Sequence, residues 1–128
     1  MIVVDVNVLV HLHMPGKESA AAEALLESDS EWVAPVLWRS EFRNALAGYL
    51  RRGELTLKSA CLIQHEAEVL MSEGEYDVDS LRVLELADRS GCTAYDCEYV
   101  ALAQRLGCRL VTREEQILQT FPEMAVPL

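Results

Sequence analysis

The chain has 128 residues, of which 51% are hydrophobic and 25% charged, and its formal net charge at pH 7 is −10. This length predicts a single domain spanning residues 1–128, and the composition is that of a soluble globular protein. The negative charge argues against a protein that coats nucleic acid non-specifically, because such proteins are normally basic.

Membrane insertion and secretion are not expected. No apolar run approaches the roughly 18 residues that cross a bilayer, and no basic segment precedes the apolar start of the chain, as a signal peptide would require. The cysteines form neither a CxxC motif nor a zinc-binding spacing; they are Cys61, Cys92, Cys97 and Cys108. Reduced thiols in the cytosol are the default for such a chain, so we expect a cytoplasmic protein.

The first half of the chain alternates between strand and helix patterns. Met1–Asp5 is a continuous apolar run that ends in an acid, which is typical of a central parallel strand. Pro15 and Gly16 mark a turn, and the alanine-rich segment Lys17–Glu27 predicts a helix. Trp32–Ala34 is a short buried strand, and Leu37–Arg52 has helical spacing.

The second half predicts further helices and two more strands. The helices are Thr56–Ser72, Ser80–Arg89, Thr93–Leu106 and the short Glu114–Leu118; a connecting segment covers Glu73–Val78, and the strands are Arg109–Thr112 and Met124–Val126. Strands that alternate with helices imply a parallel sheet with right-handed crossovers. We therefore expect an α/β fold with three layers, in which helices flank a central parallel sheet of four to five short strands.

Four acidic residues stand where a predicted strand ends or a predicted helix begins: Asp5, Glu41, Asp96 and Glu114. Ligands of open parallel sheets bind outside the carboxyl ends of the strands, so these side chains can meet there. Converging carboxylates repel one another unless a cation lies among them, and oxygen ligands favour Mg²⁺ or Mn²⁺ over Zn²⁺. Hydrated divalent ions held by carboxylates are a common apparatus for phosphodiester hydrolysis.

Each acid also has a structural alternative. Asp5 could form a turn or cap the following segment, but an acid directly after Ile2-Val-Val usually has a ligand or a strong partner. Asn7 could be a turn former or could orient a water or a phosphate. Glu41 could simply favour the positive end of its helix dipole.

The last two acids lie in possible capping boxes. Thr93 to Asp96 has the shape of a capping box, which leaves capping and metal ligation equally open for Asp96. Thr112 to Glu115 is a better capping box. That pattern assigns Glu115 to helix capping and leaves Glu114 free for a site.

Taken together, these segments resemble the PIN domain, and in particular the VapC-like toxins of toxin–antitoxin pairs. The start Ile2-Val-Val-Asp5-Val-Asn7 is similar to the family's opening strand with D-x-[NST], and Ser40-Glu41 followed by Asn44 is similar to its second acidic position. The helix Tyr95–Ala103 resembles Y-D-x-x-Y-x-A-L-A, and Leu110–Glu114 resembles L-V-T-x-D. The four motifs occur in the family's order over essentially the whole chain.

The resemblance implies a metal-dependent endoribonuclease that hydrolyses RNA phosphodiesters. Asp5, Glu41 and Asp96 would bind Mg²⁺ or Mn²⁺, and Asn7 and Thr112 would assist. Glu114 would complete the metal site, although the family usually has Asp at that position.

The resemblance also implies partners, namely an RNA substrate, a small antitoxin protein and a second copy of the chain in a homodimer. Apolar positions in the two middle helices could supply the dimer surface; they include Leu57, Ile63, Leu70, Leu81 and Leu84. An alternative is a catalytically weak or inactive PIN-like module that binds RNA or a protein. A phosphoacceptor receiver domain is disfavoured, because Asp5 has no neighbouring acid and the last lysine is Lys58.

Overall fold

A computed structural model describes all residues, 1–128, and shows a five-stranded, fully parallel sheet in the order β3-β2-β1-β4-β5. The strands are β1 (Ile2–Val4), β2 (Trp32–Pro35), β3 (Glu75–Tyr76), β4 (Leu110–Thr112) and β5 (Ala125–Pro127). The central strand β1 pairs with β2 through Val3 and Val33, and with β4 through Val4 and Val111. Because all strands run the same way, the carboxyl ends of β1, β2 and β4 share one edge of the sheet.

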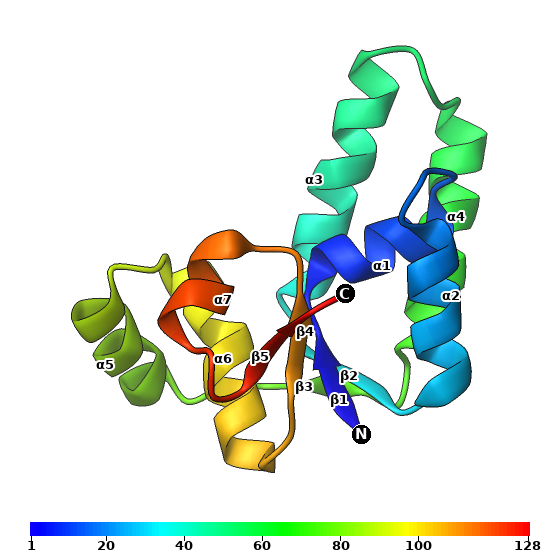
Figure 1. Ribbon diagram of the computed structural model, residues 1–128. Helices are drawn as coiled ribbons and strands as arrows, with labels where there is room; N and C mark the ends of the chain where they lie inside the picture. Colours follow the sequence, from blue (N-terminus) through cyan, green and yellow to red (C-terminus); the bar gives the residue numbers. More distant parts are fainter.

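Helices lie on both sides of the sheet, which gives the three layers expected from the sequence (Figure 1). They are α1 (Val6–His13), α2 (Ser19–Ser28), α3 (Trp38–Arg51), α4 (Leu57–Leu70), α5 (Ser80–Ser90), α6 (Ala94–Leu106) and α7 (Glu115–Thr120). Helices α3 and α4 form a hairpin that extends away from the sheet, while α5, α6 and α7 gather on the opposite side (Figure 1). No helix has the length and hydrophobicity of a membrane span.

The core includes buried side chains of α1, α3 and α4 as well as those between the sheet and α6. Val3 and Val4 of β1 are fully buried, and on α6 the residues from Tyr99 to Ala103 are all buried. Burying apolar surface stabilises the fold by roughly 25 cal/mol for each Å² removed from water. The same packing fixes the first turn of α6 against the carboxyl edge of the sheet, because α6 contacts β1, β2 and β4.

Local signals fix both ends of α6. The hydroxyl of Thr93 accepts a hydrogen bond from the N–H of Asp96 at 3.1 Å, which caps the start of the helix. Gly107 ends the helix with a φ of +65°, a left-handed conformation that glycine adopts without steric cost. The position of Asp96 in the first turn therefore follows from the local sequence.

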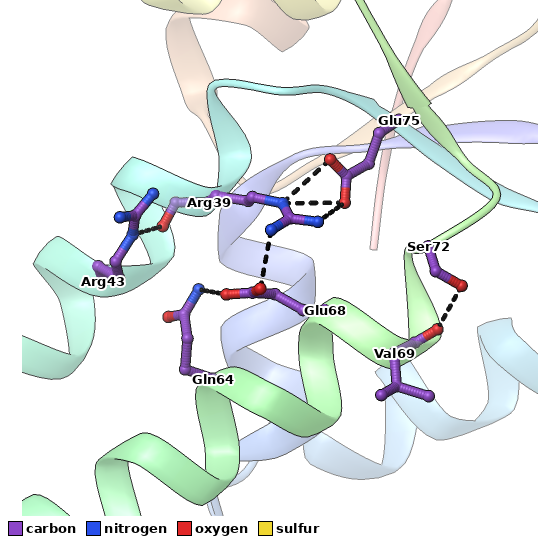
Figure 2. Close-up of polar contacts among 7 residues, drawn as sticks. All are labelled: Arg39, Arg43, Gln64, Glu68, Val69, Ser72 and Glu75. Carbon is purple, nitrogen blue, oxygen red and sulfur yellow. Dashed lines mark hydrogen bonds and ion pairs between the residues drawn. The ribbon is translucent and has the colours of Figure 1, made fainter.

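A polar network holds the α3–α4 hairpin against the edge strand β3 (Figure 2). The guanidinium of Arg39 donates to both carboxylate oxygens of Glu75 at 2.7–3.0 Å and to Glu68 at 2.8 Å. Gln64 donates to the other oxygen of Glu68 at 2.8 Å. One arginine thus pairs with two carboxylates and joins α3, α4 and β3.

The expected fold class is confirmed, and most helices begin and end within about two residues of their expected bounds. Two elements were not expected. Helix α1 follows β1 directly, although its Val6, Val8 and Val10 have low helix propensity, because packing overrides propensity here. The two-residue strand β3 lies inside the segment expected to be only a connection.

Candidate active site

The four candidate acids come from four different places in the chain and meet at one edge of the sheet. Asp5 follows β1, Glu41 lies in the first turn of α3, Asp96 lies in the first turn of α6, and Glu114 follows β4. Their electrostatic coupling shows the proximity, because Asp96 and Glu114 both help to raise the pKa of Asp5. Asp5 and Asp96 in turn help to raise the pKa of Glu41.

Asp5 is the most deeply buried of these acids, with 5% of its surface exposed. Its Oδ1 accepts a hydrogen bond from the N–H of Val6 at 2.7 Å, so it caps α1. Its Oδ2 accepts one from the hydroxyl of Thr112 at 2.6 Å. Burial nevertheless raises the pKa of Asp5 from 3.8 to about 6, against the opposing effect of these two hydrogen bonds. Asp5 therefore both caps α1 and belongs to the acid cluster.

Thr112 joins the two strands that carry the site. Its fully buried hydroxyl donates to Asp5 and accepts the N–H of Glu114 at 2.8 Å. Because this hydroxyl serves Asp5 and Glu114, it does not cap α7, which begins only at Glu115 and has no side-chain cap. The expectation that Glu115 belongs to a capping box with Thr112 is therefore wrong; its carboxylate instead accepts a bond from Gln119 at 3.5 Å.

Glu41 is held by a residue that the sequence did not single out. The hydroxyl of Tyr99, on a buried side chain of α6, donates to Oε1 of Glu41 at 2.7 Å. Burial raises the pKa of Glu41, and the bond from Tyr99 opposes that rise. Tyr99 follows Asp96 by three residues and so shares its side of the helix, which is the signal that could have indicated it.

The capping box between Thr93 and Asp96 is only half formed, because the carboxylate of Asp96 takes no part in it. The bond from the Asp96 N–H to Thr93 is formed, but the reciprocal bond from the N–H of Thr93 to the carboxylate is not. Burial raises the pKa of Asp96, and the nearby charge of Glu114 raises it further. The carboxylate therefore belongs electrostatically to the acid cluster.

A hydrogen bond between Asn7 and Arg113 connects the first turn of α1 with the loop after β4. Oδ1 of Asn7 accepts the N–H of Arg113 at 3.2 Å, and its amide nitrogen lies 3.5 Å from Oδ2 of Asp5. The guanidinium of Arg113 pairs with Glu18 at 3.2 Å, and so is directed to a carboxylate outside the cluster. Asn7 thus fixes the backbone at Arg113, next to Thr112 and Glu114.

The donor set fits a hydrated divalent cation. All the candidate ligands are carboxylate oxygens, and none of the ion pairs in the chain involves Asp5, Glu41, Asp96 or Glu114. No three acidic, histidine or cysteine side chains are grouped closely enough to ligate one ion together. Mg²⁺ is usually bound through only one or two carboxylates and keeps several waters, so one or two of these acids would hold the ion at a time.

Comparisons with known proteins find one family model and one relative that match nearly the whole chain. The family model described as the PIN domain matches residues 2–122. Ribonuclease VapC3 from Pyrobaculum aerophilum is 31% identical to the chain, over 98% of each sequence.

Solved structures share the fold. A crystal structure of a protein from Pyrobaculum aerophilum matches 98% of this chain and 89% of its own, with a TM-score of 0.79 and 23% identity. A toxin–antitoxin complex from Klebsiella pneumoniae matches 98% of this chain and 96% of its own, with a TM-score of 0.71 and 17% identity. The structure of FitAcB from Neisseria gonorrhoeae matches 100% of this chain and 97% of its own, with a TM-score of 0.73 and 18% identity.

Proposed function

Because the chain belongs to the PIN domain family and is a VapC-like member of it, we propose that it is a Mg²⁺- or Mn²⁺-dependent endoribonuclease, the toxin of a toxin–antitoxin pair. One observation carries the proposal. Four carboxylates from distant parts of the chain share one edge of the sheet, with no cation of the protein to neutralise them. The identity to a ribonuclease over nearly the full length supports RNA as the substrate.

The proposed roles follow from burial and bonding. Asp5 and Asp96 are the primary metal ligands, and Glu41 either binds the metal or orients a water, with Tyr99 fixing its rotamer. Glu114 completes the cluster from the loop after β4. A bound Mg²⁺ or Mn²⁺ would lower the pKa of a water and stabilise negative charge on the scissile phosphate.

Hydrogen bonds from the protein prepare the site for this role. The hydroxyl of Thr112 and the N–H of Val6 hold the carboxylate of Asp5 in one orientation. With a pKa of about 6, Asp5 is mostly ionised at neutral pH and so can accept a cation there. Asn7 holds the backbone of Arg113, between Thr112 at the end of β4 and Glu114, against the start of α1.

We further propose that the protein binds a small antitoxin and forms a homodimer, and that residues 1–128 are one domain. One of the similar solved structures is a toxin–antitoxin complex. Several apolar side chains on α4 and α5 are exposed and could supply interfaces, namely Leu57, Leu62, Val69, Leu81 and Leu84, whereas Ile63 and Leu70 are partly buried. A basic side chain from an antitoxin would neutralise the carboxylates and exclude metal. Light scattering should then give twice the chain mass of 14.3 kDa.

A second candidate is a PIN-like module that binds RNA or a protein but cleaves poorly. One observation favours it: Glu114 is exposed and stands where the family usually has the shorter Asp. An extra methylene moves the carboxylate by roughly 1.5 Å, comparable to errors that weaken a metal site. Metal binding without any RNA cleavage would select this candidate.

The experiment that tests the proposal measures cleavage of unpaired RNA with Mn²⁺, with and without EDTA. Asp5→Asn and Asp96→Asn should each abolish cleavage while the chain stays folded. Glu85→Gln is the matched control, because Glu85 is an exposed carboxylate on α5 that pairs with Arg82. Cleavage that persists in Asp5→Asn or in EDTA would contradict the proposal.

A further inference from the structure

We propose that a surface hollow beside the acid cluster is a subsite for one unpaired RNA nucleotide, whose base stacks on Tyr95. This inference rests on the proposed ribonuclease function. The hollow has a volume of about 390 Å³ and is lined by Val6, Glu41, Asn44, Ala45 and Tyr95. These residues come from the first turn of α1, the first half of α3 and the start of α6.

The hollow is continuous with the acid cluster, because Glu41 belongs to both. Val6 directly follows Asp5, and Tyr95 directly precedes Asp96, so the hollow and the cluster use adjacent positions on the same elements. A phosphate held at the cluster would therefore place a neighbouring nucleotide at the hollow. The volume lies within the range of small-ligand pockets, roughly 300–1,000 Å³.

Tyr95 supplies the stacking surface. It is 61% exposed, and it is the only aromatic residue of the chain that is exposed, since the others are buried or half-buried. A large exposed ring gains nothing from the core, whereas bases stack on exposed aromatic side chains in proteins that bind single strands. Stacking tolerates every base, because every base has a π-face.

Asn44 supplies a polar group that can meet the edge of the base. It follows Glu41 by three residues on α3 and is exposed. The neighbouring Arg39, Glu41 and Arg43 all make side-chain hydrogen bonds, but the amide of Asn44 makes none. A carboxamide carries both donors and an acceptor, which match the donor and acceptor groups on base edges.

The remaining lining residues favour a flat apolar occupant. Val6 and Ala45 provide apolar surface, and the small side chain of Ala45 leaves room beside the ring of Tyr95. An aromatic wall, an apolar floor and one free amide match a nucleobase.

The test uses Asp5→Asn as the background, so that RNA is bound without being consumed. The probes are unpaired eight-nucleotide RNAs that carry 2-aminopurine at successive positions, titrated in Mg²⁺ while fluorescence is followed. We expect quenching at one position, its loss in Tyr95→Ala and its retention in Tyr95→Phe. Affinity should fall roughly tenfold in Tyr95→Ala, as expected for the loss of one stacked base.

Two further variants sharpen the result. Asn44→Leu keeps the size of the side chain and removes its hydrogen bonds, so it should weaken binding without abolishing quenching. Ser28→Ala is the control, because Ser28 is an exposed, uncharged side chain on α2 and does not line the hollow. It should leave both affinity and quenching unchanged.

Three results would overturn the inference. If the wild type cleaves RNA but Tyr95→Ala binds and quenches like the Asp5→Asn background, the subsite is wrong and the ribonuclease proposal stands. If the chain neither binds nor cleaves any of these RNAs, both proposals fail. If Tyr95→Ala leaves RNA binding intact but loses affinity for an arginine-rich peptide, the hollow serves a protein partner instead.

Discussion

Two groups of carboxylates lie near the start of α3, and the protein treats them in opposite ways. Glu68 and Glu75 are both paired with Arg39, which donates to them at 2.7–3.0 Å (Figure 2). Two residues further along the same helix, Glu41 has no cation and is held only by a tyrosine hydroxyl. Asp5, Asp96 and Glu114 likewise lack a cationic partner within the chain.

The difference separates carboxylates that stabilise the fold from carboxylates that cost stability. A paired and hydrogen-bonded charge can stabilise the folded state, whereas burial of unpaired charges that repel one another destabilises it. The acid cluster therefore lowers the free energy of unfolding of the chain. The contrast between the two groups can be tested one side chain at a time.

The largest effect is expected at Asp5. Between about pH 4 and 6 the folded chain holds a proton on Asp5 that the unfolded chain has already lost. The free energy of unfolding therefore falls as the pH rises through this range, and the shift corresponds to about 3 kcal/mol above pH 6. Asp5→Asn should remove this loss while reducing RNA cleavage by roughly two orders of magnitude or more.

Urea unfolding of the wild type and Asp5→Asn at pH 4, 5, 6 and 7 measures this effect. The difference between the two proteins should grow from pH 4 to 6 and then level off. Equal pH profiles would mean that Asp5 titrates normally. Saturating Mn²⁺ at pH 7 should stabilise the wild type more than Asp5→Asn, because the variant lacks one of the proposed metal ligands and binds the ion more weakly.

Arg39 should show the opposite behaviour. Arg39→Met leaves Glu68 and Glu75 without their cation, and the Glu75 side chain is only 15% exposed. Because Arg39 and Glu68 are about one third exposed, we expect a loss of about 1–2 kcal/mol rather than the full cost of a buried ion. Calorimetry should show unchanged affinity for Mn²⁺.

The matched control for Arg39 is Arg52→Met. The ion pair between Arg52 and Glu54 is more than half exposed on both sides, so its loss should cost well under about 1 kcal/mol. If Arg39→Met weakens Mn²⁺ binding as strongly as Asp96→Asn does, the two groups of carboxylates do not act independently.

Tyr99→Phe tests how Glu41 is held without a cation. Loss of the hydroxyl leaves Oε1 of Glu41 without its donor, which should cost about 1 kcal/mol of stability and raise the pKa of Glu41 further. Mn²⁺ affinity at pH 7 should fall several-fold. The control Tyr49→Phe should leave the stability, the pKa of Glu41 and the Mn²⁺ affinity unchanged. The ring of Tyr49 packs under Arg52 rather than on an acid of the cluster.

The smallest effects are expected at the neighbouring Glu114 and Glu115. Glu114→Gln should weaken Mn²⁺ binding with little change in stability, since Glu114 is exposed and helps to raise the pKa of Asp5. Glu115→Ala should change stability by only about 0.5 kcal/mol or less, because no capping box is formed. A larger loss in Glu115→Ala would show that Thr112 does cap α7 in solution.

Much of the fold could be predicted from the sequence because its signals are local. The apolar run before Asp5 predicted the central strand, and Thr93 and Gly107 predicted both ends of α6. Helix α1 and strand β3 were missed, since only tertiary packing makes a helix of a valine-rich segment or a strand of two residues.

The positions of the candidate acids could be predicted, but not how they are held. Tyr99 was missed because a tyrosine among apolar residues is usually explained by the core alone. Thr112 and Glu115 fit a capping box locally, yet the hydroxyl of Thr112 is bound to Asp5, 107 residues away in the sequence. A local pattern carries no information about such a distant partner.

That bond also determines when the acid cluster can exist during synthesis. A ribosome that adds about 5–20 residues per second finishes β1 almost at once, but the hydroxyl that orients Asp5 arrives only with residue 112. Until then β1 lacks its β4 neighbour, and Asp96 and Glu114 lack a sheet edge on which to meet Asp5. A nascent chain therefore carries an unfinished cluster for nearly all of its synthesis, and the chemistry of this edge begins only after β4 has joined the sheet.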